Sequence, residues 1–125
     1  MTQGLLLLAH GARDAAWAKP FEAVAAQVRE ARPGASVRLC FLEFMPPTLV
    51  QGGAELAAAG CSQVQVLPLF LGAGGHVRKD VPGLMEQLRQ QHPQVQWQLH
   101  PAVGEAPALV AAMAAVAANT LDETR

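Results

Sequence analysis

The sequence has few cysteines and few charged residues, and its charges are balanced. Cys40 and Cys61 fit no metal-binding pair spacing, so we expect two buried thiols. Lysine and arginine number 9 against 10 acidic residues, a balance that gives no basic surface for nucleic acid. Charged residues make up 15% and hydrophobic residues 51% of the 125-residue chain, which predicts one globular domain over residues 1–125.

Long apolar segments are also missing. The longest strongly apolar tract, residues 106–118, is shorter than the roughly 20 residues that a bilayer-spanning helix needs. The first residues lack the basic start and the small-residue cleavage site that are typical of a signal peptide. We therefore expect a cytoplasmic protein that has no membrane partner.

The apolar residues follow a pattern in which strands and helices alternate. Short apolar runs predict buried strands at 4–9, 37–42 and 64–71, and a polar–apolar alternation predicts an edge strand at 95–99. Helical spacing predicts helices at 14–31, 49–60 and 105–121, and another that Asp80 caps, with Pro82 in its first turn. The alternation predicts an α/β fold, a four-stranded parallel sheet with helices on both faces.

Polar side chains with possible chemistry follow each predicted strand. His10 ends the first strand, Glu43 follows the second, a glycine loop leads from the third to His76, and His100 follows the fourth. Ligands of parallel sheets bind beyond the carboxyl ends of the strands, so these residues converge on one edge. Two imidazoles and a carboxylate with open positions suit a divalent first-row metal. His100 either lines this pocket or is an ordinary turn residue, and His92 at a helix end needs no function.

Two other kinds of site are disfavoured. The glycine-rich loop at 72–75 lacks both the dinucleotide-binding glycine order and the lysine of a P-loop. Its glycines are better interpreted as keeping the approach to His76 open for something large and flat. The only serines, Ser36 and Ser62, lie outside the Gly-x-Ser-x-Gly context that a serine hydrolase needs.

Three segments together resemble a known family. They are residues 8–14, with Ala12 where the family usually has serine, residues 41–46 and residues 68–82. In this order and spacing they are similar to the small CbiX-type sirohydrochlorin chelatases, which belong to the class II chelatases. The similarity runs over essentially the whole chain. Members of that class insert cobalt, iron or nickel into tetrapyrroles without ATP.

The resemblance implies roles for particular residues. His10 and His76 would be the catalytic pair, and Glu43 would complete the metal site. Imidazole suits this reaction because it binds metal when neutral and accepts protons near pH 7. The substrate metal would be Co2+, Fe2+ or Ni2+, with no further cofactor. The residues expected to contact the tetrapyrrole are Arg13, Gly74, Gly75, Arg78, Lys79 and His100, although the basic ones could equally be solvated surface charges.

The resemblance also implies an assembly and leaves other functions open. Longer family members join two such domains with the macrocycle between them, so a homodimer would complete the pocket of this chain. The expected activity is insertion of cobalt or ferrous iron into sirohydrochlorin, during cobalamin or siroheme biosynthesis. A non-catalytic metal or tetrapyrrole carrier could use the same histidines. The chain could also be a structural subunit of a larger synthase.

Overall fold

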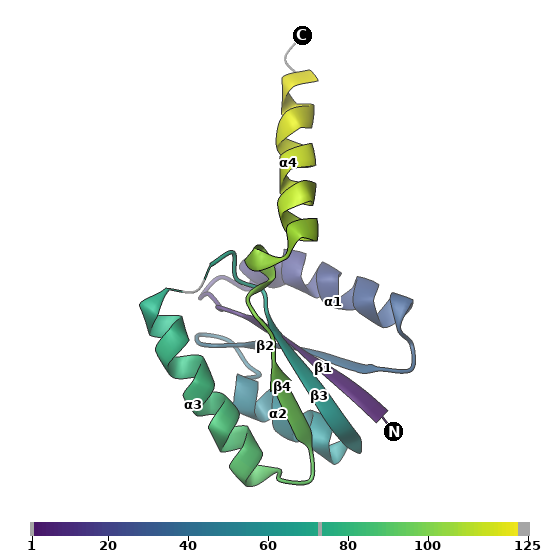
Figure 1. Cartoon of the computed structure of the whole chain (residues 1–125), viewed down its shortest axis with the longest axis vertical. Coiled ribbons are helices and arrows are strands. Elements are labelled where there is room, and N and C mark those ends of the chain that lie inside the picture. Colours follow the sequence, from purple (N-terminus) through teal and green to yellow (C-terminus); the bar gives the residue numbers. More distant parts are fainter. Residues whose placement is uncertain (1, 73, 123–125) are drawn as a thin grey trace.

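The fold is a four-stranded parallel sheet with helices on both faces, as the sequence predicts (Figure 1). The coordinates are a computed structural model that describes residues 2–72 and 74–122, and at 75–78 the helical backbone without the side chains. The strands are β1 (Thr2–Ala9), β2 (Ser36–Phe41), β3 (Cys61–Pro68) and β4 (Gln96–Leu99). Their order in the sheet is β2-β1-β3-β4, so β4 is an edge strand, as expected.

The helices alternate with these strands. They are α1 (Lys19–Ala31), α2 (Leu49–Ala58), α3 (Gly75–Gln91) and α4 (Pro107–Asp122), with short 3-10 turns η1 (Ala15–Ala18) and η2 (Val103–Glu105). Thr48 caps α2 through a capping box with Gln51, which satisfies two free N–H groups at that helix end. The predicted helix over 14–31 is divided in the structure. Asp14 caps η1, and α1 begins at Lys19, with Pro20 in its first turn.

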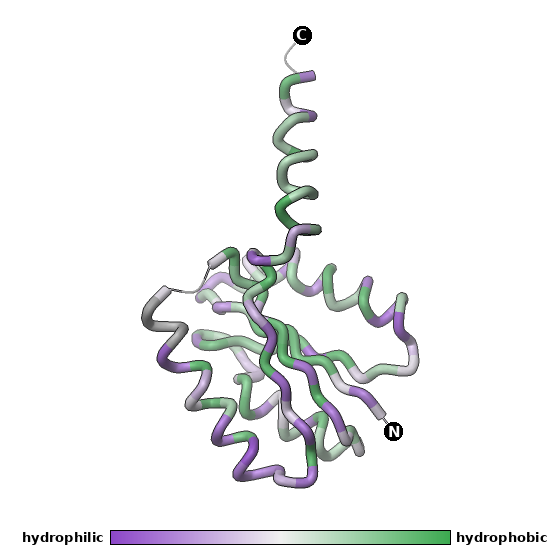
Figure 2. The backbone as a smooth tube through the Cα atoms, in the orientation of Figure 1, coloured by the Kyte–Doolittle hydropathy of each residue, from purple (hydrophilic) through white to green (hydrophobic). Residues whose placement is uncertain are grey.

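The two faces of the sheet bury different sets of apolar side chains. Leu6, Leu8, Val64 and Val66 point to the side that α2 and α3 cover. The alternate residues of β1 and β2, Leu7 among them, pack against α1 on the opposite side. Period-two alternation of side chains along a strand explains this division. Figure 2 shows the apolar residues concentrated along the inner strands of the sheet.

The third strand and the third helix have other bounds than those predicted. The third strand runs from Cys61 to Pro68 and not over 64–71. Pro68 has no N–H to donate toward β4, although the Leu69 N–H still donates to the Leu8 carbonyl of β1 at 2.7 Å. The third helix begins at Gly75, with Gly74 and not Asp80 as its N-cap residue. Pro82 is therefore inside α3 and not in its first turn.

α4 stands apart from the rest of the domain. It rises from the carboxyl edge of the sheet and projects away from it (Figure 1). Its described contacts are mainly with η2, and Val110, Met113, Val116 and Leu121 are exposed although they are apolar. Within the described residues, no helix is both long enough and apolar enough to cross a membrane. Both cysteines are free and buried, which confirms the prediction of two thiols.

Candidate functional site at the carboxyl edge of the sheet

The loops that follow β1 and β2 hold His10 and Glu43 next to each other. The Leu42 N–H donates to the Ala9 carbonyl at 3.0 Å, and the Glu43 N–H donates to the His10 carbonyl at 3.1 Å. These bonds extend the pairing of β1 with β2 beyond the last residues of both strands. The two side chains are therefore positioned by the backbone of the sheet, since regular pairing fixes the loops at their base.

Gly11 allows the two loops to approach this closely. Its φ of +93° lies in the left-handed region, where side chains other than glycine's are strained. A Cβ atom at this position would overlap the carbonyl oxygen of Glu43. The close packing of the two loops therefore requires glycine directly after His10.

The imidazole of His10 packs against the buried ring of Phe70. Its centroid lies 4.2 Å from that of Phe70, with the two rings inclined at 31°. Phe70 is only 2% exposed, so its position is fixed by the core, whereas His10 itself is exposed. The contact orients the imidazole and leaves it accessible to a ligand.

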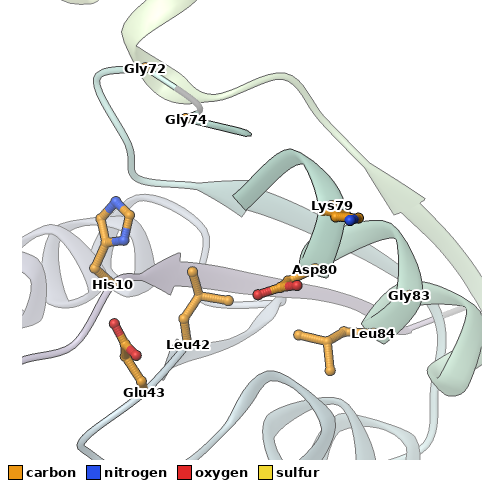
Figure 3. A pocket seen from close by; sticks show the side chains of 9 residues that line it. All are labelled: His10, Leu42, Glu43, Gly72, Gly74, Lys79, Asp80, Gly83 and Leu84. Carbon is orange, nitrogen blue, oxygen red and sulfur yellow. The ribbon is translucent and has the colours of Figure 1, made fainter. Parts of the chain in front are cut away.

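His10 and Glu43 open into one cavity of about 750 Å³ (Figure 3). The cavity is lined by His10, Leu42, Glu43, Gly72, Gly74, Lys79, Asp80, Gly83 and Leu84. In Figure 3 the His10 ring is directed toward the 72–74 loop, and the Glu43 carboxylate is turned toward His10. A volume of this size is in the range of small-molecule sites, roughly 300–1,000 Å³.

Asp80 lines the cavity, whereas its place in the sequence predicts a helix cap. It lies in the second turn of α3, and its carboxylate is turned toward the His10 side of the cavity (Figure 3). The available signal was its spacing of four residues after His76, which places two positions on one side of a helix. This spacing is meaningful only if His76 and Asp80 are in the same helix, which begins at Gly75. A helix that began after Asp80 would leave His76 outside it.

The described side chains do not form a complete metal cluster. Among them, no three histidine, cysteine, aspartate or glutamate residues lie close enough together to hold an ion. Gly75, His76 and Arg78 are in the first turn of α3, and their side chains lie outside the described part. Of the expected metal ligands, the structure therefore brings His10 and Glu43 together, and His76 stays a prediction.

His100 is not among the cavity residues. Its Nε2 lies 2.6 Å from Oε1 of Gln65, a β3 residue whose neighbours Val64 and Val66 point to the α2–α3 side. Gln65 consequently points to the opposite side of the sheet, the side that α1 covers. The cavity is lined by α3 residues, so the hydrogen bond holds His100 away from it.

One of the expected basic residues lines the cavity, and a second lies in the loop that follows His10. Lys79 lines the cavity directly. Arg13 follows His10 by three residues and places its guanidinium carbon 5.2 Å from the centroid of the Phe44 ring. Phe44 directly follows Glu43, so the Arg13–Phe44 pair belongs to the same two loops as His10 and Glu43.

The fold and the cavity together define a class of protein. Proteins of this class are parallel α/β domains that have a histidine and a glutamate at the carboxyl edge of the sheet, beside a loop rich in glycine. The sequence profile of the CbiX family matches residues 4–120. The chain therefore belongs to the CbiX family.

Individual relatives agree with this membership. The crystal structure of a CbiX protein from Marinobacter aquaeolei VT8 has a TM-score of 0.86 and 34% identity, covering 98% of this chain and 99% of that one. The sirohydrochlorin chelatase SirB from Bacillus subtilis subspecies spizizenii, in complex with cobalt, has a TM-score of 0.68 and 25% identity, covering 81% and 44%.

A curated relative gives a similar result. The sirohydrochlorin cobaltochelatase of Methanosarcina acetivorans is 29% identical over 82 residues, which are 66% of this chain and 63% of that protein. The chain thus matches less than two thirds of the length of this relative.

Proposed function

We propose that this protein is an enzyme that inserts a divalent metal, cobalt or ferrous iron, into sirohydrochlorin without ATP. The observation that carries the proposal is the pairing of His10 with Glu43 at one cavity, in a chain of the CbiX family. The relatives support it, since the Methanosarcina protein is named a sirohydrochlorin cobaltochelatase.

The histidines would carry the proton chemistry. Metallation removes two pyrrole N–H protons from the macrocycle while a cation enters its centre. A neutral imidazole can first bind the cation and then, once the cation has left, accept a proton. His10 is accessible and oriented by Phe70 for this task. The family motif supplies His76 as the second group.

Glu43 would complete the metal site. Its carboxylate turns toward His10 and would offset part of the charge of the arriving cation. Cobalt and ferrous iron both accept mixed imidazole and carboxylate ligands, and Ni2+ does so as well. The site holds its cation only until the ring nitrogens replace the protein ligands, so the metal is a substrate and not a resident cofactor.

The basic residues around the cavity would bind the carboxylates of the tetrapyrrole. Lys79 lines the cavity, Arg13 packs on the Phe44 ring in the two loops that carry His10 and Glu43, and the motif adds Arg78. Gly74 and Gly75 would allow the flat ring to approach without obstruction. His100 is left out of this set, because its bond with Gln65 holds it on the other face of the sheet.

We further propose a homodimer in which the second copy completes the pocket. The alignment with SirB covers only 44% of the SirB chain, so this domain corresponds to about half of that protein. The apolar side chains of α4 are exposed and would be covered by the second copy. The two free buried thiols fit a reducing compartment, which supports a cytoplasmic location.

Metal insertion into sirohydrochlorin, followed by the absorbance change of the macrocycle, tests the proposed activity. The parent protein should form more metallated product than there is protein when it is supplied with Co2+ or Fe2+. His10→Ala and His76→Ala should each slow the reaction by about 100-fold or more, because general acid–base groups contribute roughly 10²–10⁴-fold.

Matched variants make this result specific. His92→Ala removes a histidine from the far end of α3, and Glu86→Gln removes a carboxylate from its exposed surface, so both should keep the parent rate. Unchanged rates in both active-site histidine variants would end the assignment. Product that stops at one equivalent per protein would identify a carrier instead of an enzyme.

A further inference from the structure

Phe44 has an unfavourable backbone conformation next to the proposed site. Its φ is +71°, and it is the one residue other than glycine with a positive φ in the described part of the chain. The Met45 N–H donates to the Glu43 carbonyl at 2.9 Å and closes a three-residue turn around Phe44. Turns of this kind with a positive φ are rare and strained, above all for a bulky residue.

The strain is not compensated by burial of the side chain. Phe44 is 58% exposed. Glycine or asparagine could adopt this backbone conformation more easily. The one described contact of the Phe44 ring is with Arg13, whose guanidinium carbon lies 5.2 Å from the ring centroid. Backbone strain of this kind persists at functional sites, where it holds a group in position for a ligand.

The same two loops carry the reactive pair and the Arg13–Phe44 pair. Arg13 follows His10 by three residues, and Phe44 is the immediate neighbour of Glu43. A ligand that reaches both His10 and Glu43 and is as broad as a macrocycle would extend over these loops. An exposed aromatic ring joined to a cation presents a flat apolar surface and a positive charge together, which suits a planar molecule bearing carboxylates.

We infer that Phe44 is a binding residue for the tetrapyrrole. The exposed part of its ring contacts the macrocycle, and Arg13, held against that ring, pairs with a carboxylate at the macrocycle rim. The strained turn serves to keep the aromatic ring at the side of the cavity. The inference rests on the proposed function and adds a specificity-determining residue to it.

Binding of metal-free sirohydrochlorin, followed by its absorbance or fluorescence, tests this role. Phe44→Asn and Phe44→Gly keep the positive φ but remove the ring, and each should raise the Kd by about two- to tenfold, as expected for an aromatic contact. Phe44→Trp keeps an aromatic surface and should bind within twofold of the parent. In turnover, KM should rise in the Asn and Gly variants while kcat changes little, which indicates lost ground-state binding.

Controls separate this inference from the proposed function. Binding of Co2+ alone should be the same in the parent and in all three variants, because His10 and Glu43 are retained. A parent-like Kd in both Phe44→Asn and Phe44→Gly would overturn the role of Phe44 and leave the proposed function standing. A Trp variant as weak as the Asn variant would overturn it as well. A parent protein that neither binds nor metallates sirohydrochlorin would instead refute the proposed function.

Discussion

Gly11 is the residue on which the geometry of the cavity depends most directly. Replacing it with alanine would place a side chain in the left-handed region and push a Cβ atom into the Glu43 carbonyl. The φ strain alone costs about 1–2 kcal/mol, and the overlap adds to it. We expect Gly11→Ala to lower the free energy of unfolding by more than about 2 kcal/mol in urea titrations. Metal insertion should also be slowed, since Glu43 has to move.

A second glycine provides the control for this prediction. Gly34 has no positive φ and open space where its Cβ would stand. Gly34→Ala should therefore leave both the stability and the rate close to those of the parent. If Gly11→Ala behaved in the same way, the close approach of the two loops would not be what holds His10 beside Glu43.

Cys40 gives the core a predictable response to alkaline pH. Burial raises the pKa of its thiol from 9.0 to about 12, an effect that the positive charge of Arg38 only partly offsets. Below pH 9.0 the thiol is protonated in both the folded and the unfolded chain, so it adds no pH dependence. Between pH 9.0 and about 12 only the unfolded chain loses this proton, so stability must fall as the pH rises.

Cys40→Ala isolates that contribution. The difference in unfolding free energy between parent and variant should be constant below pH 9 and should change above it, by up to about 1.4 kcal/mol per pH unit. Urea unfolding at a series of pH values measures it, and the other titrating groups are common to both proteins. Parallel curves up to pH 11 would show that the Cys40 thiol ionises as easily in the folded protein as in the unfolded chain.

At the scale of the elements, the strands were easier to predict than the ends of the helices. The apolar run of β1 has one interpretation, because only a strand buried on both faces is so uniformly apolar over so short a length. The start of α3 was mispredicted because Pro82 and Asp80 together look like the beginning of a helix. Proline removes one N–H from the helical ladder, and here the helix continues through it.

The candidate site was predictable only as far as its edge of the sheet. Strand alternation places His10 and Glu43 at one edge, but their adjacency requires β1 and β2 to be neighbours, a fact of topology that local patterns do not contain. The same limit explains His100, which ends a strand at that edge but whose side chain bonds to Gln65 on the other face. The turn at Phe44 left no signal at all, since its residue type disfavours the conformation that it adopts.

At the scale of the whole molecule, the described contacts of α4 leave most of its large apolar side chains exposed. Most of the stability of helices in proteins comes from packing of an apolar face against the rest of the fold and not from helix propensity. α4 has 16 residues, and Val116 in its middle is 68% exposed. It also rises from the edge of the sheet that carries the cavity (Figure 1). A second copy that covered α4 would therefore lie near the site that it is proposed to complete.

Two substitutions on the exposed apolar side of α4 test the homodimer. Introducing charge through Met113→Glu together with Val116→Glu should convert a dimer into a monomer in gel filtration with light scattering. Each buried apolar side chain contributes about 1.5–3 kcal/mol, and a symmetric dimer contains every substitution twice, so the dimer Kd should rise by at least about 100-fold. Insertion activity should fall with dissociation, because each pocket would lose the half that its partner supplies.

Asn119→Glu is the control for this test, since it adds one of these two negative charges to α4 without removing an apolar side chain. That variant should remain a dimer with the parent activity, which would assign the effect to the apolar contacts and not to the charge. A parent protein that is monomeric at micromolar concentration and still turns over at full rate would refute the homodimer. In that case the exposed side chains of α4 would need another partner, because water alone does not stabilise so apolar a helix surface.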